Sequence, residues 1–98
     1  MIWTRIFETP HDTLLAAADE ELVGKEFRDK KFRLKVSESF YKDVLVSEET
    51  MGELLVLCSV ANLVGERCVG KAVELGLVSE DNILYIDGVP HAQFSLLE

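Results

Sequence analysis

The distribution of apolar and polar positions predicts strands in the first half of the chain. Residues 2–7 are rich in β-branched and aromatic side chains, which is typical of a strand. Pro10 interrupts this pattern, and residues 14–18 return as a second, largely apolar strand. In residues 31–36 every second position is apolar, so one face of the segment is apolar and the other is basic. We therefore expect a hairpin that begins near Phe27.

The middle of the chain has a helical pattern. Ser47 can cap a helix whose first turn is acidic, as the helix dipole favours. Apolar and small residues then recur at steps of three and four up to Gly76, which is suited to end a helix. One helix of this length would span about 40 Å, whereas a domain of this size is only about 32 Å across. We therefore expect a break near Asn62 and two helices, at about residues 48–60 and 63–75.

The chain closes with a hairpin pattern. Asp87 and Gly88 strongly favour a two-residue turn between paired strands, because both tolerate a positive φ. A strand at residues 83–86 should therefore lead into a return strand at residues 89–97. This order of elements predicts an α+β fold: a mainly antiparallel sheet from the N-terminal strands and the C-terminal hairpin, with the two helices packed on one face. Residues 1–98 are enough for a single domain with one core.

Charge is distributed unevenly along the chain. The formal net charge is −8, which taken alone argues against a nucleic-acid partner. Residues 25–35, however, contain six basic and two acidic residues, a local charge of +4. The remaining residues include only four basic and sixteen acidic side chains. The basic residues of the segment are Lys25, Arg28, Lys30, Lys31, Arg33 and Lys35.

Alternation separates the two faces of this basic segment. Phe32, Leu34 and Val36 should point into the core. Three basic residues should stand exposed on the other face, about 6.6 Å apart along a strand: Lys31, Arg33 and Lys35. This spacing suits the phosphates of an extended single strand, and Phe27, Phe32 or Tyr41 could stack on a base. The leading hypothesis is a non-enzymatic binding module for RNA or a ribonucleoprotein, and the alternative is a solvated face whose lysines discourage edge pairing.

Two short polar stretches could form an enzyme site instead. Asn62 and Glu66 would lie one turn apart on a predicted helix, followed by Arg67. His91 and Gln93 share one face of a predicted strand. A Glu66–His91 pair could do acid–base chemistry, since histidine titrates near neutral pH and a carboxylate can orient its ring. Against this second hypothesis, the same residues could simply cap a helix, pair at the surface and bond to the backbone; whether the protein is an enzyme stays open.

A third hypothesis is a protein-interaction subunit whose acidic surface meets a basic partner. Small residues on the predicted helices leave a monomer and a weak homodimer both open. No metal or cofactor is expected, because His11 and His91 are the only histidines and no phosphate-binding or dinucleotide loop is present. Cys58 and Cys68 are expected to be buried as small apolar residues. No apolar run reaches the roughly 18 residues of a membrane helix and no signal-peptide pattern is present, so the expected location is the cytoplasm.

Four stretches of the chain carry a resemblance to a known family. They are residues 61–67 (ANLVGER), 88–93 (GVPHAQ), 19–25 (DEELVGK) and 36–41 (VSESFY). Together they resemble the archaeal domain-of-unknown-function family 424 over nearly the whole chain. The resemblance implies an archaeal cytoplasmic protein of unassigned activity, and it supplies no catalytic residues. Two positions depart from the family pattern: Ala18 stands where a cysteine is expected, and Asp29-Lys30 where an acidic residue and a glycine are expected.

Overall fold

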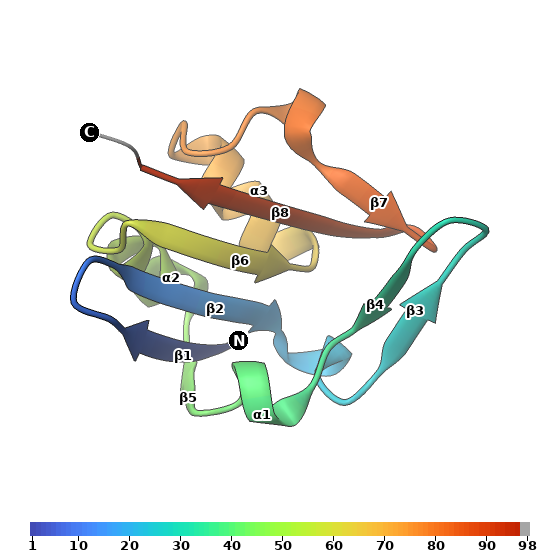
Figure 1. Cartoon of the computed structure of the whole chain (residues 1–98), viewed down its shortest axis with the longest axis horizontal. Coiled ribbons are helices and arrows are strands. Elements are labelled where there is room, and N and C mark those ends of the chain that lie inside the picture. Colours follow the sequence, from blue (N-terminus) through green and yellow to red (C-terminus); the bar gives the residue numbers. More distant parts are fainter. Residues whose placement is uncertain (97–98) are drawn as a thin grey trace.

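A six-stranded sheet organises the fold, and the computed structural model describes residues 1–96 (Figure 1). Its strands are β1 (Ile2–Glu8), β2 (Thr13–Asp19), β5 (Val44–Val46), β6 (Val60–Val64), β7 (Leu84–Ile86) and β8 (Val89–Ser95). They lie side by side in the order β5-β1-β2-β6-β8-β7. In this sheet β2 and β6 run parallel, and the other neighbouring pairs are antiparallel. The predicted α+β class with a mainly antiparallel sheet is therefore confirmed.

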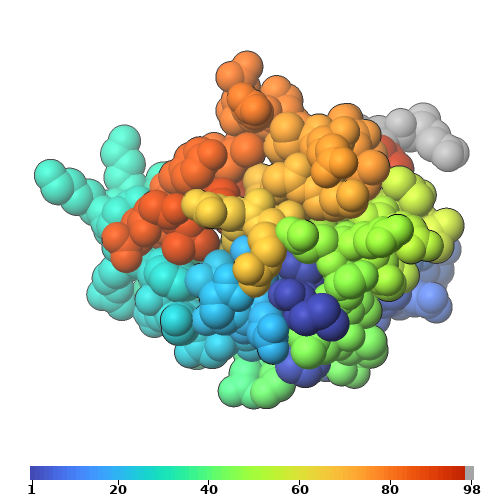
Figure 2. Space-filling view, turned by 180° about the vertical axis from the view of Figure 1, so that it is seen from behind, coloured from blue at the N-terminus to red at the C-terminus, as the bar shows by residue number. Residues whose placement is uncertain are grey.

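Two helices cover one face of this sheet. In α2 (Glu48–Leu55) the backbone N–H of Thr50 donates to the hydroxyl of Ser47, at 3.1 Å, so the predicted cap is present. The helices α2 and α3 (Glu66–Glu74) lie behind the sheet in Figure 1, and Figure 2, seen from that side, shows them in yellow-green and orange. Their apolar side chains pack on the sheet through Met51, Leu55, Val69 and Ala72, against Leu15, Ala17 and Leu63. No helix within residues 1–96 is long and apolar enough to cross a membrane.

The predicted boundaries of the two helices are wrong, because a strand separates them. Instead of helices at residues 48–60 and 63–75, the structure ends the first at Leu55, begins the second at Glu66 and places β6 between them. The length argument located the break near Asn62 correctly, but it assigned most of β6 (Val60–Val64) to the two flanking helices. A short apolar run fits both a strand and a helix, and pairing with β2 and β8 on its two sides makes it a strand. Asn62 consequently lies on the sheet and shares no helix face with Glu66.

The opposite face of the sheet is covered only in part. The single-turn helix α1 (Glu38–Tyr41) and a separate hairpin of β3 (Glu26–Arg28) and β4 (Arg33–Lys35) lie on it, and the hairpin itself is as predicted. Their buried side chains contact the sheet in a second apolar cluster, which includes Leu34, Val36, Tyr41, Ala16, Ala18, Val64 and Ile86. Residues of β6 and β8 on this face are half-buried or exposed beyond the cluster, so part of the sheet surface remains open.

The C-terminal hairpin forms as predicted. Asp87 and Gly88 both have a positive φ, of 51° and 79°, and Ile86 pairs with Val89 across the turn. This register places Pro90 and His91 on opposite faces of β8, because side chains alternate along a strand. The predicted end of the return strand, at Leu97, lies outside the described residues.

Candidate functional site

The basic hairpin, residues 25–35, is anchored by its apolar side and turns its charges outward. Leu34 and the adjoining Val36 are 8% and 0% exposed and pack on the sheet. At the base of the hairpin the N–H of Val36 donates to the carbonyl of Lys25 at 2.9 Å. The six basic residues are all exposed: Lys25, Arg28, Lys30, Lys31, Arg33 and Lys35. In Figure 2 the cyan side chains of this segment project from one side of the molecule. The hairpin therefore folds through its apolar residues and presents its cations at the surface.

Two guanidinium groups lie together on the outer side of the hairpin. Arg28 is directly opposite Arg33 in the β3–β4 register. The carboxylate of Glu26 joins them, with its Oε2 3.4 Å from Arg28 Nη2 and 3.5 Å from Arg33 Nε. Both arginine side chains are more than 60% exposed, at 67% and 63%, so these ion pairs contribute little to stability. Glu26 offsets the repulsion between the arginines, and both remain accessible to an external anion.

The tip of the hairpin is an ordered turn rather than a continuation of the strand. Asp29 Oδ1 accepts hydrogen bonds from the N–H groups of Lys31 and Phe32, both at 2.9 Å, and these bonds lower the pKa of Asp29. Lys31 thus belongs to the turn, and β4 begins only at Arg33. The expectation that Phe32 lies in the core is wrong, because this side chain is 45% exposed. Lys31, Arg33 and Lys35 are exposed as expected, but they do not form one straight row along a strand.

A side-chain cluster on the open sheet face meets at the amide oxygen of Asn62. The hydroxyl of Tyr41 donates to Asn62 Oδ1 at 2.7 Å, and His91 Nε2 lies 3.2 Å from the same oxygen. An amide oxygen only accepts, so Nε2 carries the proton in this contact and the neutral ring leaves Nδ1 as an acceptor. Burial lowers the pKa of His91, which keeps the ring neutral at neutral pH. Tyr41, expected to stack on a base, is 4% exposed and serves as a buried donor instead.

Beside this cluster lies a cavity of about 390 Å³. Asn62 and Gln93 are directly opposite each other across β6 and β8, and both line it. The other lining residues are Leu14, Val60, Ala61, Phe94 and Ser95. Within the described part of the chain, neither the amide nitrogen of Asn62 nor the side chain of Gln93 has a hydrogen-bond partner. These groups are therefore available to a ligand.

The structure does not bring Glu66 to His91. Glu66 is exposed at the start of α3 and lines a groove on the helix side of the sheet, together with Pro90. His91 follows Pro90 in β8 and so points to the opposite face. The carboxylate–imidazole pair that the enzyme hypothesis requires is absent from the described residues, and Asn62 is the partner of the ring.

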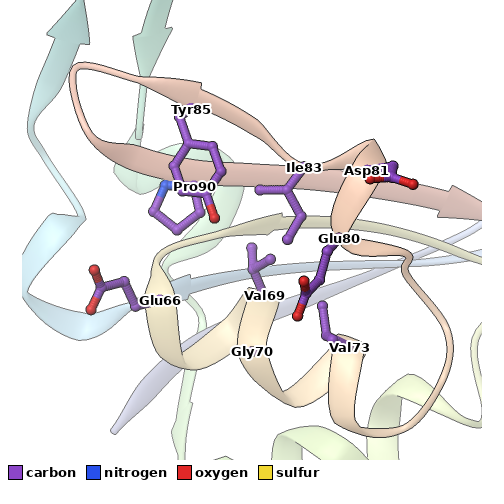
Figure 3. A pocket seen from close by; sticks show the side chains of 9 residues that line it. All are labelled: Glu66, Val69, Gly70, Val73, Glu80, Asp81, Ile83, Tyr85 and Pro90. Carbon is purple, nitrogen blue, oxygen red and sulfur yellow. The ribbon is translucent and has the colours of Figure 1, made fainter.

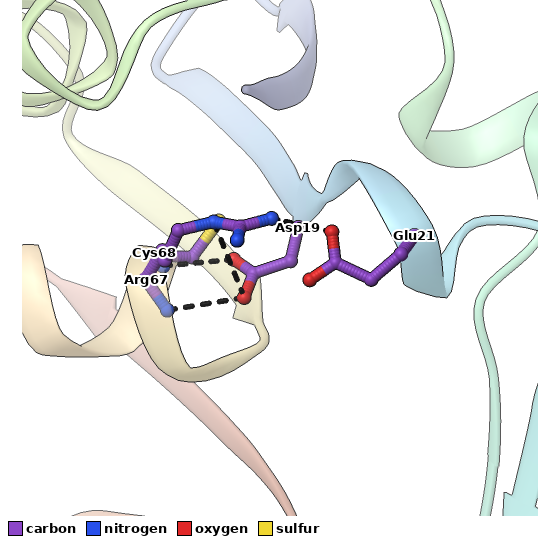
Figure 4. A network of polar contacts seen from close by, with 4 residues as sticks. All are labelled: Asp19, Glu21, Arg67 and Cys68. Carbon is purple, nitrogen blue, oxygen red and sulfur yellow. Dashed lines mark hydrogen bonds and ion pairs between the residues drawn. The ribbon is translucent and has the colours of Figure 1, made fainter.

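A buried carboxylate connects the end of β2 to the first turn of α3 (Figure 4). Asp19 is 3% exposed and accepts hydrogen bonds from the N–H groups of Arg67 and Cys68, at 3.1 and 3.0 Å. Asp19 makes no capping hydrogen bond to the short 3₁₀ turn, Glu20–Leu22, that follows it. Arg67 pairs with Glu21 and not with its neighbour Glu66. Because Asp19 occupies the N-terminus of α3, this helix end offers no free anion site.

The sequence pattern did not identify Asp19 as a cap of α3. The thiol of Cys68 lies next to this carboxylate. Burial and the Asp19 carboxylate raise the pKa of Cys68 well above that of an ordinary thiol. Cys58 is also buried, and both cysteines are free. Neither is suited to act as a nucleophile, since the thiolate is the reactive form. Among residues 1–96 no group of three or more histidine, cysteine, aspartate or glutamate side chains could hold a metal ion.

A groove of about 730 Å³ lies between α3 and β7 on the helix side of the sheet (Figure 3). Its apolar part consists of Val69, Gly70, Val73, Ile83, Tyr85 and Pro90. The charged side chains that line it are all acidic: Glu66, Glu80 and Asp81. These carboxylates give the groove a negative charge, which repels a polyanion.

The chain is similar to known proteins in sequence and in structure. The model of a family described as "Protein of unknown function (DUF424)" matches residues 7–97. The fold is similar to the crystal structure of an uncharacterized conserved protein from Methanopyrus kandleri, with a TM-score of 0.77 and 29% sequence identity. This match covers 99% of the present chain and 94% of the other. No curated protein matches the chain.

Proposed function

The chain belongs to the DUF424 family of archaeal proteins, and we propose that it is a cytoplasmic, non-enzymatic module that binds single-stranded RNA through the basic hairpin. The single observation that carries the proposal is that the cations in residues 25–35 are exposed and do not hold the hairpin to the sheet. All six are exposed, and the hairpin is held to the sheet by apolar contacts, while backbone hydrogen bonds join its own two strands. Cations that are not needed for folding, at a local charge of +4 in a chain of −8, are suited to bind phosphates.

The arrangement of the hairpin supports phosphate binding in detail. Arg28 and Arg33 present two planar guanidinium groups side by side, and each can bind a phosphate through two parallel hydrogen bonds. Lys31 extends the positive surface to the tip, and Lys35 extends it toward the sheet. The exposed ring of Phe32 offers an aromatic surface on which a base can stack.

The charge of the rest of the molecule favours a single strand over a duplex. Outside the hairpin the chain carries sixteen acidic and four basic residues, and the groove between α3 and β7 is lined by carboxylates. A duplex is broad and has a high charge density, so it would bring phosphates close to this acidic surface. A single strand can follow the hairpin and the open sheet face. The two buried free thiols support a reducing compartment such as the cytoplasm.

The direct test is the fluorescence anisotropy of a labelled eight-nucleotide RNA in 50 mM salt. The wild-type protein should bind it, and the Arg28→Gln, Arg33→Gln double variant should bind at least about tenfold more weakly, because two phosphate contacts are lost. Lys42→Gln is the matched control, since Lys42 is an exposed cation outside the hairpin. Equal affinities for the double variant and the wild type would overturn the proposal, as would the absence of any binding.

A further inference from the structure

The open sheet face next to the hairpin carries a patch of uncharged polar groups, here called the amide patch: Asn62, His91 and Gln93. Asn62 lies opposite Gln93 in the β6–β8 register, and His91 is two residues before Gln93 on the same side of β8. The His91 ring is uncharged like the two amides, because burial lowers its pKa and keeps it neutral. The patch therefore has no positive charge at neutral pH.

The hydrogen bonds within the cluster decide what the patch presents to a ligand. Tyr41 and His91 both donate to Asn62 Oδ1, so Asn62 presents its amide N–H groups. His91 has its proton on Nε2 and presents Nδ1 as an acceptor. The unpartnered amide of Gln93 presents both a donor and an acceptor. Donors and acceptors thus stand next to each other in an array that the buried hydroxyl of Tyr41 orients.

The surroundings of the patch suit a flat, partly apolar ligand. The adjoining cavity of about 390 Å³ is within the usual range of small-molecule sites, about 300–1,000 Å³. Leu14 and Val60 border it with half-buried apolar side chains. A planar ring can lie against these side chains while its edge bonds to the amides.

These features match a nucleobase and not a phosphate. A phosphate needs cations, and no lysine or arginine lines this cavity. The edge of a base, in contrast, consists of neutral donors and acceptors, which proteins read on unpaired RNA with amide and imidazole side chains. The hairpin packs on the same face of the sheet, through Leu34 and Val36, so both surfaces lie on one side of the molecule.

We infer that the amide patch is a nucleobase-binding site, which holds a base of the same RNA strand whose phosphates contact the basic hairpin. This inference rests on the proposed function. The hairpin supplies sequence-independent affinity, and the patch supplies the contacts that distinguish a base from a bare ribose–phosphate chain. Gln93 is the most exposed member of the patch and can be changed without disturbing the buried Tyr41–Asn62–His91 contacts.

The test compares oligonucleotides with and without bases. Anisotropy measures the affinities for eight-nucleotide oligo(A), oligo(C) and oligo(U) and for an abasic ribose–phosphate oligonucleotide of the same length. The best base-containing oligonucleotide should bind about tenfold more tightly than the abasic one. Gln93→Ala should reduce this ratio several-fold, whereas the control Asn82→Ala, an exposed amide on a different surface element, should not. The Arg28→Gln, Arg33→Gln variant should weaken all affinities and keep the ratio.

The outcomes separate the two proposals. If abasic and base-containing oligonucleotides bind equally well and both depend on the hairpin arginines, RNA binding stands and the nucleobase site is wrong. A preference for bases that survives Gln93→Ala unchanged would place base recognition elsewhere and also overturn the inference. If no oligonucleotide binds in 50 mM salt, the proposed function fails, and the nucleobase site fails with it.

Discussion

Gly65 lies against the carboxylate of Asp19 so closely that no side chain fits between them. A Cβ on Gly65 would lie 2.3 Å from Asp19 Cγ and 2.5 and 2.6 Å from its two oxygens. Gly65 also has a φ of +108°, which L side chains rarely adopt. This contact brings the end of β2 to the start of α3, where Asp19 accepts the N–H groups of Arg67 and Cys68. The helix therefore begins where it does because a distant carboxylate and a glycine meet there.

Replacing Gly65 by alanine should destabilise the protein by at least about 2 kcal/mol, because the backbone strain adds to the clash with Asp19. Urea unfolding measures the effect. Gly70→Ala is the control, and it should increase the free energy of unfolding. A Cβ there meets nothing within 4 Å, and alanine is the better helix former by up to about 1 kcal/mol. Two variants of equal stability would contradict the role assigned to the Gly65–Asp19 contact.

Replacing Tyr41 by phenylalanine should cost about 1 kcal/mol of unfolding free energy, because a buried hydrogen bond to Asn62 is lost. Tyr85→Phe provides the comparison, since Tyr85 is 59% exposed and its hydroxyl should contribute less than about 0.5 kcal/mol. Chemical denaturation of both variants tests this. An unchanged midpoint for Tyr41→Phe would mean that the hydroxyl does not orient Asn62.

Acidification should weaken the folded state through His91. Burial lowers the pKa of this ring in the folded protein, so below the unfolded value of about 6.5 the unfolded chain binds more protons. The stability that the neutral ring provides is therefore present above that pH and is lost as the pH falls. Between pH 7.5 and pH 5.0, the midpoint of thermal unfolding should fall further for the wild type than for His91→Gln. Acidic groups such as Asp29 titrate in both proteins and cancel in the comparison. Identical losses would contradict the prediction.

Local signals accounted for much of the fold. The apolar segments of β1 and β2, the alternating segment around β4, the cap at Ser47 and the turn at Asp87 depend on residues close in sequence, and all formed. β6 could not be predicted in this way. It lies at the centre of the sheet with apolar residues on both faces, so it lacks a regular alternation of apolar and polar positions. The β-branched Val60 and Val64, followed by Gly65, were the available signal for a strand.

Only part of the candidate site was predictable from the sequence. Glu66 and Arg67, two of the expected members, lie away from His91. Asn62, His91 and Gln93 were expected to converge, and Asn62 does lie within hydrogen-bond distance of His91. They meet through strand pairing, however, and not through a helix laid over a strand. The cap of α3 by Asp19 bridges 48 residues of sequence to Arg67, and it follows only from the parallel pairing of β2 with β6.

The salt dependence of RNA affinity tests the central claim most directly. Lys31, Arg33 and Lys35 should each contribute about −0.7 to the slope of log affinity against log salt, or roughly −2 together. Their three contacts alone predict a loss of roughly 20-fold between 50 and 200 mM salt. Replacing all three by glutamine should remove about 2 units of slope. It should barely change the thermal midpoint, because these side chains are exposed. A slope that is the same in the wild type and the triple variant would contradict phosphate binding by the hairpin.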